Sequence, residues 1–111
     1  MKPLSAFLIL LLAAVLEAGG DAILRRGLHG HDLTVRLGLI IAGGLVLTAY
    51  GVTVNLPPWD FGRLLGVYVA LFFVVAQVIN RAAFGVTPTA PVLLGGALIL
   101  SGALVMTFWR A

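Results

Sequence analysis

Four long apolar runs, separated by short polar stretches, constrain this 111-residue chain more than any other feature. The first runs from Leu4 to Leu24, and as a helix it would be about 31 Å long, enough to cross the hydrocarbon core of a bilayer. The other three lie at residues 37–54, 62–84 and 91–109. We therefore predict an all-α integral membrane protein with four transmembrane helices per subunit, forming one domain over residues 1–111.

The composition weighs against a water-soluble enzyme. Hydrophobic residues make up 61% of the chain and charged residues only 10%, against roughly 25% charged residues in an average soluble domain. So few charges cannot cover a globule of this size with a solvated surface. The sequence also contains no catalytic triad and no glycine-rich phosphate loop. We expect no enzymatic activity and no cofactor.

The net charge of +3 does not indicate nucleic acid as a partner. The seven basic residues are scattered along the chain, as expected for charges that flank membrane spans. His29, His31 and Asp32 are three possible metal ligands in one polar turn, but such a set rarely forms a site alone, so we predict no metal. The absence of cysteine excludes disulfides and thiolate chemistry.

The first run has an alternative interpretation. Lys2 precedes the apolar stretch from Leu4 to Leu16, an arrangement also found in secretory signal peptides. Three further apolar runs follow it, rather than a soluble mature domain, and this favours a membrane span.

The polar stretches between the runs contain helix-ending residues. Residues 27–32 (GLHGHD) predict a turn that begins at Gly27, directly after the basic pair Arg25 and Arg26. Residues 55–60 (NLPPWD) contain two prolines, and Asp60 could cap the third helix. Gly85 is placed to end that helix, and Thr89 could cap the fourth.

Four spans place both termini on one side of the membrane. Three basic residues (Lys2, Arg63 and Arg110) then lie on that side, against four (Arg25, Arg26, Arg36 and Arg81) on the other. This near balance specifies no orientation. Two possibilities remain open: the chain inserts both ways round and pairs as an antiparallel homodimer, or a subtler signal decides its orientation.

Glu17 is the most informative residue, because it lies within the first span, about 10 Å from the end that leads into the first loop. An isolated charged carboxyl at this depth costs several kcal/mol, so Glu17 should face protein or water, and it could exchange a proton. Ala13, Ala14 and Gly20 share its helix face and leave room for a partner helix or a substrate. The alternative is a protonated side chain that only hydrogen-bonds a neighbouring helix.

Other polar residues in the spans are further candidates. Asp21 lies one turn beyond Glu17 on the same face, where it could tune the proton affinity of Glu17 or simply pair with Arg25 at the interface. Tyr68 and Gln77 are candidate pocket residues in the third run, although an aromatic residue in a membrane helix more often serves packing.

Small residues at regular spacing predict helix contacts. Gly62, Gly66 and Ala70 form a small-xxx-small ridge in the third run. The fourth run has no ionisable residue and repeats small residues seven apart, so we predict that it is a dimerisation helix. The predicted packing residues are Gly95 with Gly102, and Gly96 with Ala103.

Three segments together resemble the small multidrug resistance family of transporters. They are residues 16–25 (LEAGGDAILR), 62–68 (GRLLGVY) and 91–102 (PVLLGGALILSG). Glu17 matches the essential membrane-embedded glutamate of that family, and Tyr68 stands where the family places a pocket tryptophan or tyrosine. The pair Gly62 and Arg63 is most similar to the YnfA-like branch. Leu65, Leu71 and Phe72 depart from the drug-exporting branch, which has a tyrosine and helix-kinking glycines in this region.

The resemblance implies an antiparallel homodimer in the bacterial inner membrane. In such a dimer a proton and a small cationic or amphipathic solute compete for the paired Glu17 side chains. The resemblance implies Glu17, Tyr68 and Thr48 as proton- and substrate-binding residues, where Thr48 matches a hydroxyl residue of the second helix. We add Asp21 because it shares the helix face of Glu17, although it stands where the family has a small or hydroxyl residue. The competing hypothesis is a non-transporting membrane scaffold or subunit, or a lipid-handling protein, in which Glu17 is only a hydrogen-bond donor between helices.

Overall fold

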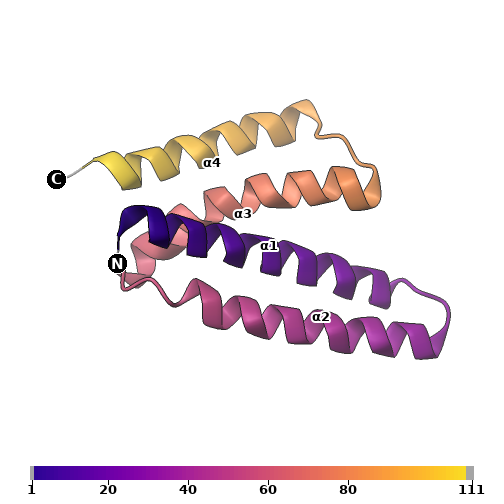
Figure 1. Cartoon of the computed structure of the whole chain (residues 1–111). Coiled ribbons are helices and arrows are strands. Elements are labelled where there is room, and N and C mark those ends of the chain that lie inside the picture. Colours follow the sequence, from indigo (N-terminus) through magenta and orange to yellow (C-terminus); the bar gives the residue numbers. More distant parts are fainter. Residues whose placement is uncertain (1, 110–111) are drawn as a thin grey trace.

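A computed structural model describes residues 2–109 and contains four α-helices (Figure 1). They are α1 (Pro3–Leu28), α2 (Leu33–Val54), α3 (Phe61–Phe84) and α4 (Ala90–Phe108). All four are long and apolar enough to cross a membrane, and no strand occurs within the described residues. The predicted fold class is therefore confirmed at the level of one subunit.

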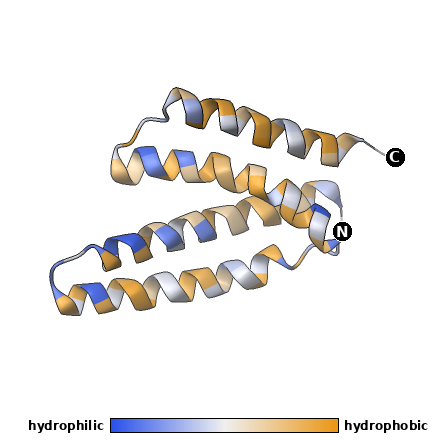
Figure 2. Ribbon diagram, turned by 180° about the vertical axis from the view of Figure 1, so that it is seen from behind, coloured by the Kyte–Doolittle hydropathy of each residue, from blue (hydrophilic) through white to orange (hydrophobic). Residues whose placement is uncertain are grey.

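The helices lie side by side in the order α2, α1, α3, α4, as Figure 1 shows. The resulting subunit is a thin slab with principal extents of 54 × 34 × 19 Å. Helix α1 packs against both α2 and α3, whereas within residues 2–109 α4 packs against α3 alone. Figure 2 shows that hydrophilic residues of α1 and α3 gather toward the ends next to the α1–α2 and α3–α4 connections. Helix α4 is apolar around most of its circumference, as expected for a helix that faces lipid or another chain.

The turn between α1 and α2 is shorter than the sequence predicted. Helix α1 continues through Gly27 to Leu28, because Gly27 packs closely against α2. A Cβ atom added at Gly27 would lie 3.1 Å from the backbone nitrogen of Ile40. Helix α2 begins at Leu33 rather than at residue 37, and Asp32 caps it by accepting the Thr34 N–H at 3.3 Å. Arg36 then donates to the Gly27 carbonyl oxygen at 3.2 Å, which also accepts the Gly30 backbone N–H at 3.4 Å, so this carbonyl at the end of α1 is satisfied from outside the helix.

The remaining helix ends follow the predicted signals in two of three cases. Asp60 caps α3, because its carboxylate accepts the backbone N–H of Arg63 at 3.1 Å. Gly85 ends α3 in the left-handed region, with φ of 67°. Thr89 occupies the N-cap position of α4, but its side chain makes no capping hydrogen bond.

Two arginines join the ends of α1 and α3. The Arg26 guanidinium donates to the Ala83 carbonyl oxygen at 2.6 Å, in the last turn of α3. The guanidinium carbons of Arg25 and Arg26 also lie 6.0 and 5.5 Å from the centre of the Phe84 ring. A cation at the C-terminus of a helix is favourable, because the last carbonyl groups carry partial negative charge. These contacts hold α1 and α3 together at the membrane edge.

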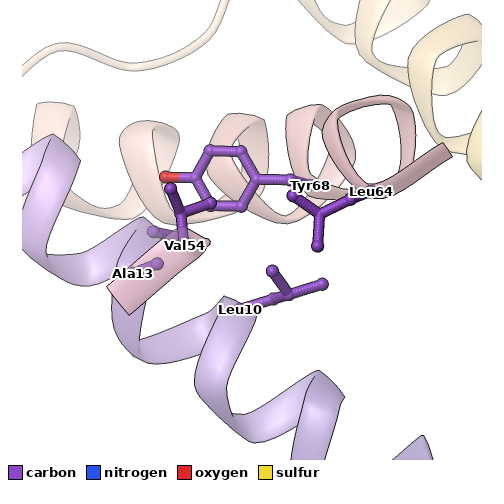
Figure 3. Packing of buried hydrophobic residues seen from close by; sticks show 6 residues of the cluster. Leu10, Ala13, Val54, Leu64 and Tyr68 are labelled. Atoms are coloured by element: carbon purple, nitrogen blue, oxygen red, sulfur yellow. The ribbon is translucent and has the colours of Figure 1, made fainter. Parts of the chain in front are cut away.

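The buried core lies where α1 meets α3, beside the last turn of α2 (Figure 3). Leu10, Ala13 and Ala14 of α1 are fully buried there, and the small side chains of the two alanines let α3 approach closely. In Figure 3 the Tyr68 ring extends from α3 across Val54 toward α1. This core holds α1 and α3 close enough for a direct polar contact between them.

Glycines bring α1 and α2 into close contact. A Cβ atom added at Gly20 would lie 3.0 Å from the Leu47 side chain. A Cβ added at Gly43 would lie 3.0 Å from both the Gly20 carbonyl oxygen and the Leu24 backbone nitrogen. The small residues that share the helix face of Glu17 therefore pack, at Gly20, against α2 of the same chain.

Replacing Gly43 by alanine should destabilise the protein, because the new methyl group would meet backbone atoms of α1 that cannot move independently. We expect the free energy of unfolding to fall by about 1–3 kcal/mol, as in other overpacked sites. Unfolding in sodium dodecyl sulfate, followed by circular dichroism, measures it. Gly44→Ala is the matched control, since within residues 2–109 no atom beyond the neighbouring part of α2 lies within 4 Å of a Cβ added there. An equal loss in both variants would contradict the close α1–α2 contact.

Candidate functional site

Glu17 and Tyr68 are joined by a hydrogen bond between α1 and α3. The Tyr68 hydroxyl donates to Oε1 of Glu17 at 2.8 Å. Tyr68 is only 3% exposed, whereas Glu17 is partly exposed. Tyr68 belongs to the buried core, and Glu17 lies one helical turn beyond the core residues Ala13 and Ala14. The two residues that the sequence singled out on separate helices therefore meet directly.

Two further aromatic rings surround the Tyr68 phenol. The ring of Tyr50 on α2 lies 5.8 Å from the Tyr68 ring, measured between centres, and Phe72 lies 6.2 Å away on α3. Tyr50 was not among the predicted site residues. Its one sequence signal is a position four residues before Val54, on the helix face that reaches the core. That signal becomes informative only when the packing of α2 is known.

The geometry gives Glu17 two chemical options. As a charged carboxylate, it accepts the Tyr68 hydrogen bond and keeps lone pairs free for a cation on its exposed side. As a protonated carboxyl, it has no charge with which to hold a cation, although it can still accept from Tyr68. Because the rings of Tyr50, Tyr68 and Phe72 are apolar over most of their surface, the gain or loss of charge at this position matters more than it would in water.

Asp21 lies in a neighbouring cavity and not at the Glu17–Tyr68 bond. The cavity measures about 480 Å³ and lies between α1 and α3 toward their arginine-linked ends. Asp21, Gln77 and Asn80 supply polar groups to its lining, which also includes Ala18 and Phe72. Phe72 contacts the Tyr68 ring, so the cavity reaches within one residue layer of the hydrogen bond. Gln77, which the sequence indicated as a candidate pocket residue, lies in this lining.

The alternative ion pair between Asp21 and Arg25 is not formed in the part of the chain that the structure describes. Arg25 instead lies over the Phe84 ring, although it also contributes to the cavity lining. The Asp21 carboxylate is exposed, and it faces a cavity that contains two side-chain amides.

Thr48 is not brought to Glu17. Its side chain is exposed, and its hydroxyl donates to the Gly44 carbonyl oxygen of its own helix at 3.0 Å. Such a bond satisfies the hydroxyl locally and leaves it no role in the bond between Glu17 and Tyr68.

The four predicted dimer-packing residues of α4 point in two directions. Gly96 packs against the Phe73 ring of α3, and Ala103 is buried at 7% exposure. Apart from the neighbouring residues and backbone of α4 itself, no atom of the described chain lies within 4 Å of a Cβ added at Gly95 or Gly102. Gly96 and Ala103 thus contribute to packing within the subunit, while Gly95 and Gly102 form an open face. Their role in a dimer stays a prediction.

Comparison with known proteins identifies the family. Residues 4–111 match the family model described as "Uncharacterised BCR, YnfA/UPF0060 family". The chain belongs to the YnfA/UPF0060 family.

Relatives in this family match along nearly the whole chain. A UPF0060 membrane protein of Herpetosiphon aurantiacus is 28% identical over 111 residues, which covers 98% of each chain. One from Mycolicibacterium gilvum is 33% identical over 102 residues, covering 91% of this chain and 92% of the relative. One from Frankia casuarinae is 32% identical over 111 residues, covering 99% and 98%. No solved structure matches the chain.

The family assignment agrees with the predicted location. The YnfA/UPF0060 relatives are named as membrane proteins and come from bacteria, and this chain has four helices that can span a membrane. The protein is thus an integral membrane protein, and α-helical spans are consistent with the bacterial inner membrane.

Removing the Tyr68 hydroxyl should weaken the α1–α3 contact of this YnfA/UPF0060 protein. Tyr68→Phe keeps the ring and deletes the donor, so we expect the free energy of unfolding to fall by about 1–3 kcal/mol. Unfolding in sodium dodecyl sulfate measures the loss. Thr48→Ala is the control and should change stability by less than about 0.5 kcal/mol, because its hydroxyl bonds only its own helix. An equal loss of stability in Tyr68→Phe and Thr48→Ala would argue against the Glu17–Tyr68 bond.

Proposed function

We propose that this YnfA/UPF0060 protein is a proton-coupled antiporter for a small cationic or amphipathic solute, related to the small multidrug resistance transporters, and that it is not an enzyme. One observation carries the proposal: a partly exposed carboxyl group within a membrane helix receives a hydrogen bond from a buried tyrosine of another helix. Ionisable groups inside membrane spans usually serve ion or substrate pathways.

Coupling follows from competition for the Glu17 charge. A cation binds when Glu17 is deprotonated, because the carboxylate then supplies the only formal negative charge at the Glu17–Tyr68 bond. Protonation removes that charge and releases the cation. A site that holds either a proton or a cation, but not both, exchanges one for the other when it opens alternately to the two sides of the membrane.

The neighbouring cavity supports a route to the site. Its volume of about 480 Å³ falls within the range of about 300–1,000 Å³ typical of small-molecule sites. Asp21, Gln77 and Asn80 offer a carboxylate and two amides near the membrane edge, where Arg25 and His29 also line the cavity. A cation that enters from that edge would meet Asp21 one helical turn before Glu17.

A second copy of the chain would complete the site. The subunit is only 19 Å thick in its shortest dimension, so a single chain leaves Glu17 partly uncovered. An antiparallel homodimer would bring a second Glu17 to the same space and enclose it. Two features support this arrangement: the near balance of basic residues on the two sides, and the open Gly95–Gly102 face of α4.

Glu17→Gln tests the mechanism. In the unaltered protein, cation binding should weaken by up to about tenfold for each unit by which the pH is lowered, and binding should release protons. Glu17→Gln, which keeps the shape and lacks the charge, should bind weakly, independently of pH and without proton release. Proton release by purified protein against a panel of amines and quaternary cations measures both effects. Persisting proton-coupled binding in Glu17→Gln would refute the antiporter.

The same variant distinguishes the antiporter from the competing hypothesis. If Glu17 only holds helices together in a scaffold or lipid-handling protein, then Glu17→Gln should alter dimerisation. In that case the unaltered protein should release no protons when a solute is added. Asp21→Asn is a useful companion, since it removes the exposed carboxylate of the cavity and leaves the Glu17–Tyr68 bond in place.

The open face of α4 gives a test of the dimer. Gly102→Leu should raise the dissociation constant of the dimer at least about tenfold, because a large side chain prevents close helix approach at a small-residue contact. Light scattering in detergent measures the mass of the particle. Gly44→Leu on α2 is the matched control, since its Cβ position is equally open in the subunit. An unchanged dimer in Gly102→Leu would place the interface elsewhere.

A further inference from the structure

A second, larger groove lies away from the Glu17–Tyr68 bond. It measures about 800 Å³ and runs between the first turns of α1, the first half of α3 and the second half of α4. Figure 1 places the start of α1 and the end of α4 at the same end of the subunit. The lining is almost entirely apolar and includes Phe7, Val67, Leu71, Leu100 and Phe108. Arg63 is its only charged residue among those the structure describes.

The polar end of the groove is basic. The guanidinium carbon of Arg63 lies 5.2 Å from the centre of the Trp59 ring, and both residues line the groove. Lys2 directly precedes Pro3, which lines the same end. The other polar side chain of the lining, Thr107, donates its hydroxyl to the Ala103 carbonyl oxygen at 2.8 Å. Asp60 lies outside the lining and accepts the backbone N–H of Arg63. The Arg63 guanidinium makes no hydrogen bond to an acceptor within residues 2–109.

The depth of the groove matches one leaflet of a bilayer. Arg63 and Leu71 are eight residues apart on α3, a rise of about 12 Å. Half of a typical hydrocarbon core is about 15 Å thick. Trp59 suits the headgroup level, as tryptophan usually does in membrane proteins. The groove thus begins with a cation at the interface and continues as an apolar channel through most of one leaflet.

We propose that this groove binds an anionic phospholipid, with the phosphate at Arg63 and one acyl chain along α3 and α4. Basic positions at the ends of transmembrane helices attract anionic headgroups, and a volume of about 800 Å³ is within the range of ligand sites. The positive charge of Arg63 repels the cation proposed for Glu17, so the two sites take different ligands. Leu100 and Ala103 occupy a different face of α4 from Gly95 and Gly102, so a dimer through those glycines leaves the groove open.

Tryptophan quenching tests the proposal at the site itself. Trp109→Phe leaves Trp59, in the groove, as the only tryptophan of the chain. Phosphatidylglycerol with brominated acyl chains should quench Trp59 in mixed micelles with an apparent affinity roughly fivefold higher than brominated phosphatidylcholine of the same chains, as expected for one basic contact. Adding Arg63→Gln should remove this preference. Leu100→Phe, which fills the groove, should weaken quenching by both lipids.

A matched variant distinguishes a lipid site at Arg63 from a general attraction of basic residues for anionic lipid. Arg81→Gln removes an exposed basic residue at the opposite end of α3 and should leave the preference unchanged. Equal quenching by the two lipids, or a preference that survives Arg63→Gln, would overturn the proposal. So would competition by soluble glycerol phosphate at the same concentration, which indicates a free phosphate site. A change of oligomeric state in Leu100→Phe without a change in quenching would assign the groove to a second copy instead.

Discussion

The cost of placing a carboxyl group inside a membrane is the constraint on which this structure depends. Glu17 lies in the middle of α1, and the Tyr68 hydroxyl at 2.8 Å is the partner that makes its position tolerable. That bond requires α3 to approach α1 closely, which Ala13 and Ala14 permit because they present almost no side chain. The fully buried core and the polar bond therefore occupy the same crossing of two helices, and changes in either should affect the other.

Helix number and type could be predicted because a membrane span is defined by the length of a predominantly apolar run, which can include a few charged residues such as Glu17 and Asp21. The caps at Asp60 and Gly85 were equally predictable, since each depends on local chemistry: a side-chain acceptor for a free N–H and a backbone that adopts positive φ. The prediction that the first turn begins at Gly27 was wrong. A glycine can mark either the end of a helix or a close contact between two helices, and the sequence does not distinguish the two. The backbone of Ile40 lies 3.1 Å from the space a Cβ would occupy there, and this packing keeps Gly27 inside α1.

Contacts between helices were harder to predict, because spacing shows that residues share a face and does not show what covers it. Gly95 and Gly96 are adjacent in the sequence, yet Gly96 packs on Phe73 while the Gly95 face is open. Glu17 and Tyr68 could each be proposed as site residues from their chemistry and family resemblance, but their hydrogen bond could not, because 51 residues separate them. Tyr50 was missed for the same reason: its contact with Tyr68 depends on the position of α2 beside α1.

The two ends of the α1–α3 pair differ in chemistry, and this asymmetry matters for the proposed transport. Toward the end where Arg25 and Arg26 meet Phe84, the cavity offers Asp21 and two amides, whereas the opposite end offers Arg63 beside an apolar groove. If all chains had one orientation, each side of the membrane would carry only the cavity or only the groove. In an antiparallel pair, each side of the membrane would carry one cavity lined by Asp21 and Arg25 and one basic groove, so a cation would meet an equivalent entrance from either side. Equivalent entrances suit a carrier whose direction is set by the proton gradient rather than by the shape of the protein.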